Sequence, residues 1–347
     1  MSFTSLRIVC GVKSTRSKEK VERLIFEILS ILQENKYDGP MGARTIAREL
    51  EKRGFEIGER AVRYHLKHLD ERGLTEKPES LKGRIITEKG EGEVRKDLVG
   101  KRIGFVIGKI EELIYKMSYN LQEGGGTIAA NISLLEEGKV DEALNIMKEV
   151  MEKGYAPSPL VKVSQEGESM GRFKVPKDKV GIATVCSITI DGILEGEGIP
   201  VSPKFGGVLE FRGGKPKRFT DAITYQGSSL DPLDVFASKK MASCLNVTKT
   251  GSGSILANLR EVPISARPAA LDIINQAEEK MLNGVLEVGH PAEPLFGLPV
   301  DVNRVGIAVV GGINPAVAVD ESGIQIETSP METLLDISEI HHIKDFV

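Results

Sequence analysis

Residues 180–201 read VGIATVCSITIDGILEGEGIPV, and residues 305–326 read VGIAVVGGINPAVAVDESGIQI. The two stretches align without a gap at an offset of 125 residues, and they share the run Val-Gly-Ile-Ala and a later Gly-Ile pair. Short apolar runs of this kind are typical of buried strands. The repetition therefore predicts two equivalent strands in one chain.

An earlier pair of segments repeats at nearly the same offset. Residues 126–131 (GTIAAN) match residues 253–258 (GSILAN), and an Ala-Leu-x-Ile pattern typical of a helix follows each segment. Three matches in the same order predict a domain built of two related halves, at about residues 101–203 and 204–347. Paired halves usually leave a cleft between them, and clefts bind small ligands.

Length and composition set the broad class of the protein. A chain of 347 residues with 40% hydrophobic and 28% charged residues has the composition of a globular protein of two or three domains. No apolar run approaches the roughly 20 residues of a membrane span, and the N-terminus lacks a secretion-signal pattern. We therefore expect a cytoplasmic protein with no membrane partner. Cys10, Cys186 and Cys244 are odd in number and far apart, which favours reduced thiols over a disulfide framework or a metal site.

Charge is distributed unevenly along the chain. Residues 1–100 carry 21 Lys and Arg against 17 Asp and Glu, a balance of +4, whereas residues 101–347 carry 25 against 33, a balance of −8. A basic N-terminal module on an acidic body favours contact between the N-terminal end and a polyanion.

The N-terminal part has the element order of a winged helix. Residues 1–17 are polar and without a period, so we interpret them as a flexible N-terminal arm. The winged-helix domain is expected at 18–97, with helices at 18–35, 43–53 and 59–72 and strands at 74–75 and 84–87. Residues 88–100, which include Gly90 and Gly92, read as a linker.

The third predicted helix resembles the recognition helix of known winged-helix modules. Its face away from the apolar residues displays basic side chains that can reach phosphates and base edges in a major groove. Basic residues of the second helix and of the wing could flank the DNA backbone. A solvated charged helix in a protein-binding module would look similar, but the docking geometry favours double-stranded DNA and a dimer on paired half-sites. The candidate DNA-binding residues are Arg44, Arg48, Arg60, Arg63, Tyr64, Lys67, Lys82 and Arg84.

The rest of the chain, residues 101–347, alternates strands and helices and predicts an α+β (α/β-like) fold. Strands are expected at 102–107, 126–133, 222–225, 253–259, 285–288 and 305–310, and helices at 111–120, 140–153, 232–245 and 268–282. A Gly-x-Ser-x-Gly pattern at 167–171 lacks the strand-turn-helix context of a hydrolase, and no phosphate loop, zinc-protease motif or dinucleotide fingerprint occurs. We therefore expect no catalytic residues, no metal and no cofactor.

If the halves share a fold, polar residues present in only one half are candidates for a binding site. When the two halves are aligned, Cys186, Ser187 and Thr189 correspond to the Gly-rich segment 311–314, and Arg260 corresponds to Ser133. The run around Arg218 has no close counterpart. That run leads from a strand into a helix, where N–H groups and hydroxyls can hold an anion, although Ser228, Ser229 or Asp231 could equally be a helix cap. Arginines beside glycine turns suit a carboxylate. The candidate ligand-binding residues are Cys186, Ser187, Thr189, Arg218, Tyr225, Ser228, Ser229, Asp231, Gly251, Gly253 and Arg260.

Together these segments resemble the archaeal nitrogen-assimilation repressor family, NrpR. The resemblance rests on four runs, GIATVCSIT at 181–189, RF to DPL at 218–233, NLREVP at 258–263 and GGINP at 311–315. It implies a winged helix with one sensor domain, a repressor of nitrogen-assimilation genes that 2-oxoglutarate releases from its operator. Some members carry two sensor domains, so a second sensor subunit is a further expected partner. An enzyme acting on a small acid in the same cleft, or a corepressor that bridges DNA and the transcription machinery, remain alternatives.

Overall fold

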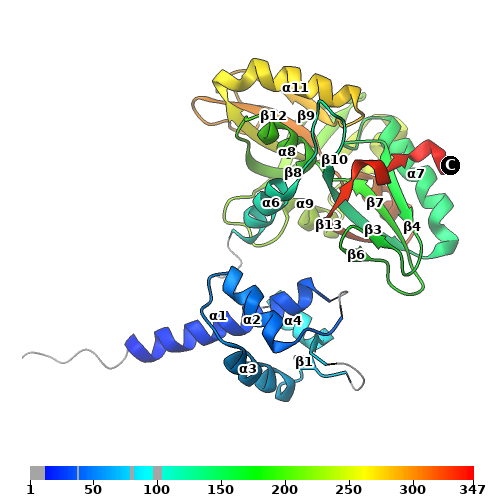
Figure 1. Cartoon of the computed structure of the whole chain (residues 1–347). Helices are drawn as coiled ribbons and strands as arrows, with labels where there is room; N and C mark the ends of the chain where they lie inside the picture. Colours follow the sequence, from blue (N-terminus) through cyan, green and yellow to red (C-terminus); the bar gives the residue numbers. More distant parts are fainter. Residues whose placement is uncertain (1–11, 37–38, 79–81, 97–103) are drawn as a thin grey trace, which may run out of the picture. The chain divides into compact units, whose positions relative to one another are not determined.

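The computed structural model describes residues 12–36, 39–78, 82–96 and 104–347. The chain divides into two compact units, Met1–Lys101 and Arg102–Val347, which we call the N-terminal and C-terminal units (Figure 1). Within the described residues, no helix is long and apolar enough to cross a bilayer.

The N-terminal unit has three helices followed by a two-stranded wing. Its elements are α1 (Val12–Glu34), α2 (Ala43–Lys52), α3 (Glu59–Glu71), β1 (Thr75–Glu76), β2 (Ile85–Ile86) and α4 (Glu88–Lys96). Strands β1 and β2 pair in antiparallel fashion. Apolar residues at helical spacing bury one face of each helix in a common core that includes Ile28, Ile46, Leu50, Val62, Leu66 and Leu69. The predicted winged helix is therefore present.

Two predicted boundaries in this unit are wrong. Helix α1 begins at Val12, so residues 12–17 of the predicted arm are helical, and residues 1–11 lie outside the described part. Residues 88–96 of the predicted linker form α4, because Val94 joins the core and Gly90 lets the helix approach the wing closely. A Cβ on Gly90 would lie 2.1 Å from the carbonyl oxygen of Leu74. The glycine that suggested a linker is a packing requirement.

The C-terminal unit contains two five-stranded antiparallel sheets. In spatial order the first holds β13 (Glu327–Asp336), β3 (Thr127–Leu135), β7 (Val180–Val185), β4 (Leu160–Ser164) and β14 (His341–His342). The second holds β9 (Lys215–Thr224), β8 (Ser202–Arg212), β10 (Gly253–Pro263), β12 (Arg304–Val310) and β11 (Val285–Val288). The helices are α6 (Phe105–Lys116), α7 (Val140–Glu152), α8 (Ile188–Gly196), α9 (Pro232–Ser238), α10 (Cys244–Thr250), α11 (Arg267–Glu279) and α12 (Asn314–Glu321). The α+β fold class is confirmed.

The sequence repeat corresponds to a repeated order of elements in which one strand is exchanged. The order β3, α7, β4, β7, α8, β8 is followed by β10, α11, β11, β12, α12, β13. Strand β8 of the first repeat pairs with β10 of the second, and β13 of the second pairs with β3 of the first. These strands begin at Ser202 and Glu327, again 125 residues apart. The predicted halves at 101–203 and 204–347 are therefore not separate lobes, since β13 and β14 complete the first sheet.

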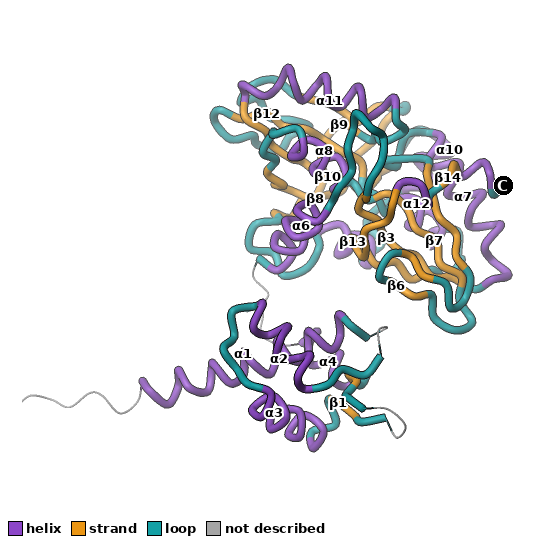
Figure 2. The backbone as a smooth tube through the Cα atoms, in the orientation of Figure 1, coloured by secondary structure: helices purple, strands orange, loops and turns teal. Residues whose placement is uncertain are grey.

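Helices and strands of both repeats share one hydrophobic core. The largest cluster joins alternate residues of β3, β7 and β12 to apolar residues of α8 and α11, and Figure 2 shows α11 lying along the second sheet. A second cluster joins α7 and α12 to β7 and β4. Each repeat therefore depends on the other for burial of its apolar faces.

Two further local predictions are corrected, and one is confirmed. Residues 105–107 belong to helix α6, not to a strand, because Val106, Ile110 and Leu113 recur at helical spacing and are buried. The helix predicted at 232–245 is two helices, α9 and α10. The Gly-x-Ser-x-Gly segment lies in a hairpin formed by β5 (Ser169–Met170) and β6 (Phe173–Lys174), which is incompatible with a hydrolase nucleophile elbow.

Candidate functional site

The exposed face of α3 carries four of the residues predicted to contact DNA, Arg60, Arg63, Tyr64 and Lys67. The apolar residues of α3 recur every three or four positions and turn the opposite face to the core, so these side chains point to solvent. The Tyr64 side chain is 62% exposed. Arg63 pairs with Glu59, and Lys67 lies 4.0 Å from Glu71. Exposed pairs of this kind are weak, so both cations remain available to a phosphate.

The predicted flanking residues have different environments. Arg44 and Arg48 of α2 and Lys82 of the wing are exposed. Arg84 is partly buried, and its Nε donates to the Asp70 carboxylate at 2.9 Å. This ion pair holds the wing against α3, so Arg84 has a structural role in addition to any contact with DNA.

A buried polar cluster lies in the C-terminal unit where three segments meet. Strand β10 places Asn258 and Arg260 on one face, because alternate residues of a strand point the same way. The hydroxyl of Ser187, at the start of α8, accepts hydrogen bonds from Asn258 Nδ2 and Arg260 Nη2, both at 3.1 Å. Tyr225, just after β9, donates its hydroxyl proton to Asn258 Oδ1 at 2.6 Å. Together with Asp191 these four residues form what we call the Arg260 cluster.

Asp191 is the charged partner of Arg260 within this cluster. It lies four residues after Ser187, so both side chains share one face of α8. Its carboxylate contacts Arg260 Nε, and the two residues are 0% and 2% exposed. Apart from this contact, four buried atoms of the pair have no hydrogen-bond partner in the described part of the chain. They are both carboxylate oxygens of Asp191 and the Nε and Nη1 atoms of Arg260. Burial raises the pKa of Asp191 to about 6, even though Arg260 acts in the opposite direction. Such an unsatisfied buried pair is costly and marks a place for an additional polar group.

Cys186 and Tyr225, which lie near the cluster, are not activated as nucleophiles or bases. Burial raises the pKa of Cys186 to about 11 and moves the pKa of Tyr225 well above its ordinary value, so both stay protonated at neutral pH. Asp231 caps α9 by accepting the backbone N–H two residues on at 3.0 Å, and burial raises its pKa to about 6. The hydroxyl of Thr189 donates to the Ala129 carbonyl at 3.2 Å, which ties α8 to β3. The arrangement suits binding of an anion better than nucleophilic or acid–base chemistry.

Arg218 does not belong to the Arg260 cluster. It lies on the edge strand β9, its side chain is 67% exposed, and it pairs with Glu210 at 3.3 Å. In the sheet register Glu210 faces Ser254, which is six residues from Arg260 along β10. At about 3.3 Å per strand residue, the two arginines are about 20 Å apart along the strands. One small dicarboxylate therefore cannot bridge Arg218 and Arg260, contrary to the sequence-based expectation.

The remaining predicted ligand residues serve local structure. Gly251 ends α10 with φ of +72°, and Gly253 begins β10 at the far end from Arg260. The hydroxyl of Ser228 donates to the Leu230 carbonyl at 2.6 Å within its own loop. Ser229 is partly exposed in the same loop. The structure therefore brings together Cys186, Ser187, Tyr225, Asp231 and Arg260 from the predicted set.

Sequence reasoning missed Asp191, Asn258 and Lys109. Asp191 lies opposite Ala316 at the repeat offset, so a comparison of the two repeats carried the signal. Asn258 has Asn131 as its counterpart, and a search for residues unique to one half passes over it. Lys109 of α6 lowers the pKa of Asp231 by its charge and donates to the Pro330 carbonyl at 3.2 Å.

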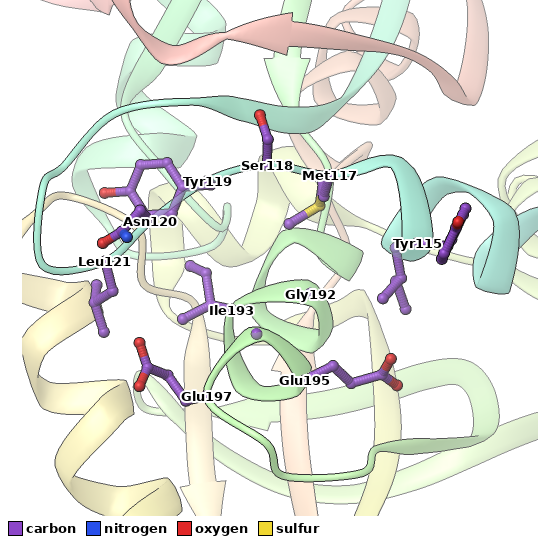
Figure 3. A pocket seen from close by; sticks show the side chains of 12 residues that line it. Tyr115, Met117, Ser118, Tyr119, Asn120, Leu121, Gly192, Ile193, Glu195 and Glu197 are labelled. Atoms are coloured by element: carbon purple, nitrogen blue, oxygen red, sulfur yellow. The ribbon is translucent and has the colours of Figure 1, made fainter.

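A cavity of about 420 Å³ lies between the end of α6 and α8 (Figure 3). Figure 3 shows the rings of Tyr115 and Tyr119 on opposite sides, with the carboxylates of Glu195 and Glu197 beneath them. None of the described residues that line it is a lysine or an arginine. Two carboxylates without a cation repel an anion, so this cavity is a poor site for a dicarboxylate.

Comparison with known proteins places both units. Residues 103–342 match the family described as NrpR regulatory domains NRD1 and 2, and residues 26–94 match the ribonuclease R winged-helix domain. The global nitrogen regulator NrpRI of Methanosarcina mazei is 43% identical over 93% of this chain and 99% of its own length. The chain belongs to the NrpR family. Membership of this winged-helix regulator family implies a nitrogen regulatory repressor that binds DNA.

Other NrpR proteins differ from this chain in length. The global nitrogen regulator NrpR of Methanococcus maripaludis is 34% identical over 90% of this chain, which spans 54% of that protein. The crystal structure of a nitrogen repressor-like protein from Methanococcus jannaschii has a TM-score of 0.60 and 31% identity, and covers 69% of this chain and 98% of its own. The aligned part of this NrpR chain thus corresponds to nearly the whole nitrogen regulator of M. mazei, but to only about half of that of M. maripaludis.

Proposed function

We propose that this NrpR protein represses nitrogen-assimilation genes as a dimer and is released from its operator by a small dicarboxylate such as 2-oxoglutarate. The observation that carries the effector assignment is the buried guanidinium of Arg260, whose Nη1 has no hydrogen-bond partner in the described structure. A guanidinium with an open donor matches one carboxylate in a forked geometry. The start of α8 and the hydroxyl of Ser187 lie beside it and supply further donors.

The DNA arm of this proposal rests on α3. A single recognition helix reads few base pairs, so two copies on paired half-sites would supply the specificity of a repressor. Arg63→Ala with Lys67→Ala removes two exposed cations from the α3 face without touching its core. We expect loss of specific operator binding and a smaller dependence of affinity on salt. Lys36→Ala with Lys52→Ala removes equal charge from two exposed lysines outside α3, which pair with Glu91 and Glu49, and should retain most of the affinity.

Release requires that the effector bind more tightly to an arrangement of the dimer in which the two winged helices do not fit the operator. A swing from about 99% bound to about 1% bound needs about 5.5 kcal/mol of differential binding. A charge-assisted contact contributes about 1.5–3 kcal/mol of such a total. Arg260 alone therefore supplies part of the switch, and the neighbouring donors would supply the rest.

The test is a titration of the complex between the full chain and an operator selected in vitro. Fluorescence anisotropy would report release of labelled DNA as 2-oxoglutarate is added. Arg260→Lys keeps the positive charge but loses the two parallel N–H donors of the guanidinium, so release should need at least about tenfold more effector. Arg218→Ala is the matched control and should behave as the parent, because Arg218 is remote from the cluster. Equal responses of Arg260→Lys and the parent would refute the assignment of the site.

A further inference from the structure

Asp191 holds the guanidinium that the effector would need. Its carboxylate contacts Arg260 Nε, while Nη2 of the same group donates to Ser187 at 3.1 Å. Both carboxylate oxygens lack a hydrogen-bond donor within the described residues. The contact is thus a charge pair without the hydrogen bonds that normally compensate a buried carboxylate. A carboxylate from solution that brought its own hydrogen-bonding geometry could take this place.

The environment of Asp191 shows how weakly the pair is compensated. Arg260 by itself would lower the pKa of Asp191, yet desolvation by burial is the larger effect and raises it to about 6. Arg260 is 2% exposed, so no solvent shell relieves its charge. The pair is therefore held by the surrounding fold and gains little from its own contact.

We propose that Asp191 is a built-in competitor of the effector, which occupies Arg260 in the free protein and is displaced by a ligand carboxylate. This inference rests on the proposed role of Arg260 as the effector anchor. The need to displace Asp191 weakens the binding of every carboxylate ligand. A ligand with one carboxylate only replaces one ion pair by another, so it gains little binding free energy. A dicarboxylate gains a second set of contacts, from Ser187 or the start of α8, and so overcomes the competitor. The cluster would thereby select dicarboxylates over monocarboxylates.

Displacement of Asp191 also provides a route to the rest of the unit. The next residue, Gly192, faces Met117 at the end of α6, and a Cβ at Gly192 would lie 2.2 Å from the methionine methyl group. The Met117 side chain at the end of α6 therefore lies directly against α8 at this point. A shift of Asp191 away from Arg260 moves α8 against α6, the first described helix after residues 97–103.

Isothermal titration calorimetry of the full chain without DNA tests the competitor directly. Asp191→Asn keeps the size of the side chain and removes its charge, so 2-oxoglutarate should bind about ten- to a hundredfold more tightly, the fold-change of one lost charged contact. The preference for 2-oxoglutarate over a monocarboxylate such as pyruvate should shrink in the same variant. Glu197→Gln is the matched control, because it removes a carboxylate that directly follows α8 and lines the α6 cavity. It should bind like the parent.

The outcomes separate the competitor from the proposed function. If Arg260→Lys weakens binding but Asp191→Asn binds no more tightly than the parent, the competitor is refuted and the site stands. If the parent does not bind 2-oxoglutarate, or Arg260→Lys binds it as the parent does, the proposed site fails and the competitor with it. If Asp191→Asn does not fold, hydrogen–deuterium exchange of the parent protein tests the inference instead. Saturation with 2-oxoglutarate should then alter exchange in α8, and unchanged exchange there would overturn the inference.

Discussion

Two glycines of α4, Gly90 and Gly92, provide a matched pair for testing whether α4 supports the wing. A Cβ added at Gly90 would lie 2.1 Å from the Leu74 carbonyl oxygen and 2.8 Å from Cγ1 of Ile86, whereas a Cβ at Gly92 would meet nothing within 4 Å. The Leu74 carbonyl also accepts the N–H of Thr87 at 3.1 Å, so it cannot retreat without weakening that bond. The same substitution, glycine to alanine, should therefore have opposite effects at positions two residues apart.

The magnitudes follow from packing and helix propensity. Gly90→Ala forces α4 away from β2 and should destabilise the N-terminal unit by about 1–3 kcal/mol. Gly92→Ala reduces the entropy of the unfolded chain at an open helical position and should stabilise it by about 0.5–1 kcal/mol. For a unit of this size, 1 kcal/mol corresponds to about 4–8 °C in the melting temperature.

Differential scanning calorimetry and far-ultraviolet circular dichroism of the full chain would measure both shifts. Operator affinity should fall in Gly90→Ala, because the wing loses its support, and should stay unchanged in Gly92→Ala. Equal melting temperatures for the two variants would refute the packing of α4 against the wing, and residues 88–96 would then be better described as a linker.

Three other perturbations follow from contacts within the two units. Gly312→Ala places a Cβ 2.7 Å from a buried amide nitrogen of the other repeat and should destabilise the C-terminal unit by about 1–3 kcal/mol in calorimetry, whereas Gly138→Ala, where a Cβ would meet nothing within 4 Å, should leave its stability nearly unchanged. Asp70→Ala removes the acceptor of Arg84 and of the Thr75 hydroxyl at 2.6 Å, and should lower the melting temperature of the N-terminal unit by the equivalent of about 1–3 kcal/mol. The pKa of Asp191 is raised from 3.8 to about 6 in the folded protein, so its contribution to stability is present below about pH 4 and is lost as pH rises through about 6, by up to about 3 kcal/mol. Chemical unfolding at several pH values would give the free energy of unfolding of the parent and of Asp191→Asn. The difference between the two should fall as pH rises, and a difference that does not change with pH would contradict the prediction.

The sequence predicted the fold where the local pattern determined the structure. Apolar spacing located α3 and α7 within a few residues, because a single face of each is buried, and a continuous apolar run located β12, of which residues 305–310 are all buried. It failed at α6, where glycines at 104 and 108 interrupt the pattern and the helical face becomes clear only from the burial of Val106 and Ile110. The sequence did not predict the exchange of β8 and β13. Which strand pairs with which depends on tertiary packing, and the apolar periodicity of a strand does not specify its partner.

The candidate site was predicted in part for a related reason. Comparison of the repeats found Ser187 and Arg260, which the structure joins at 3.1 Å. It also favoured Arg218, because the run around it has no counterpart in the other half, but the sheet register places Arg218 about 20 Å from Arg260 along the strands. Asp191 lies in α8, a helix that the sequence patterns did not predict, and its buried charge becomes conspicuous only in the structure.

The exchanged strands limit the kinds of motion that an effector can produce in the C-terminal unit. Separation of the two repeats as rigid lobes would break the ladders between β8 and β10 and between β13 and β3, which extend over most of the length of each strand. Each broken backbone hydrogen bond that stays buried costs about 1–3 kcal/mol, so the sum exceeds the few kcal/mol that a small ligand supplies. Sliding of packed helices breaks no ladder and is the class of motion that remains. Helix α8 meets this condition, because it carries Asp191 and Ser187 at its start and packs on Met117 through Gly192 in its middle. The response to the effector is therefore expected in the position of α8 against α6, and the two sheets should keep their strand order in both states.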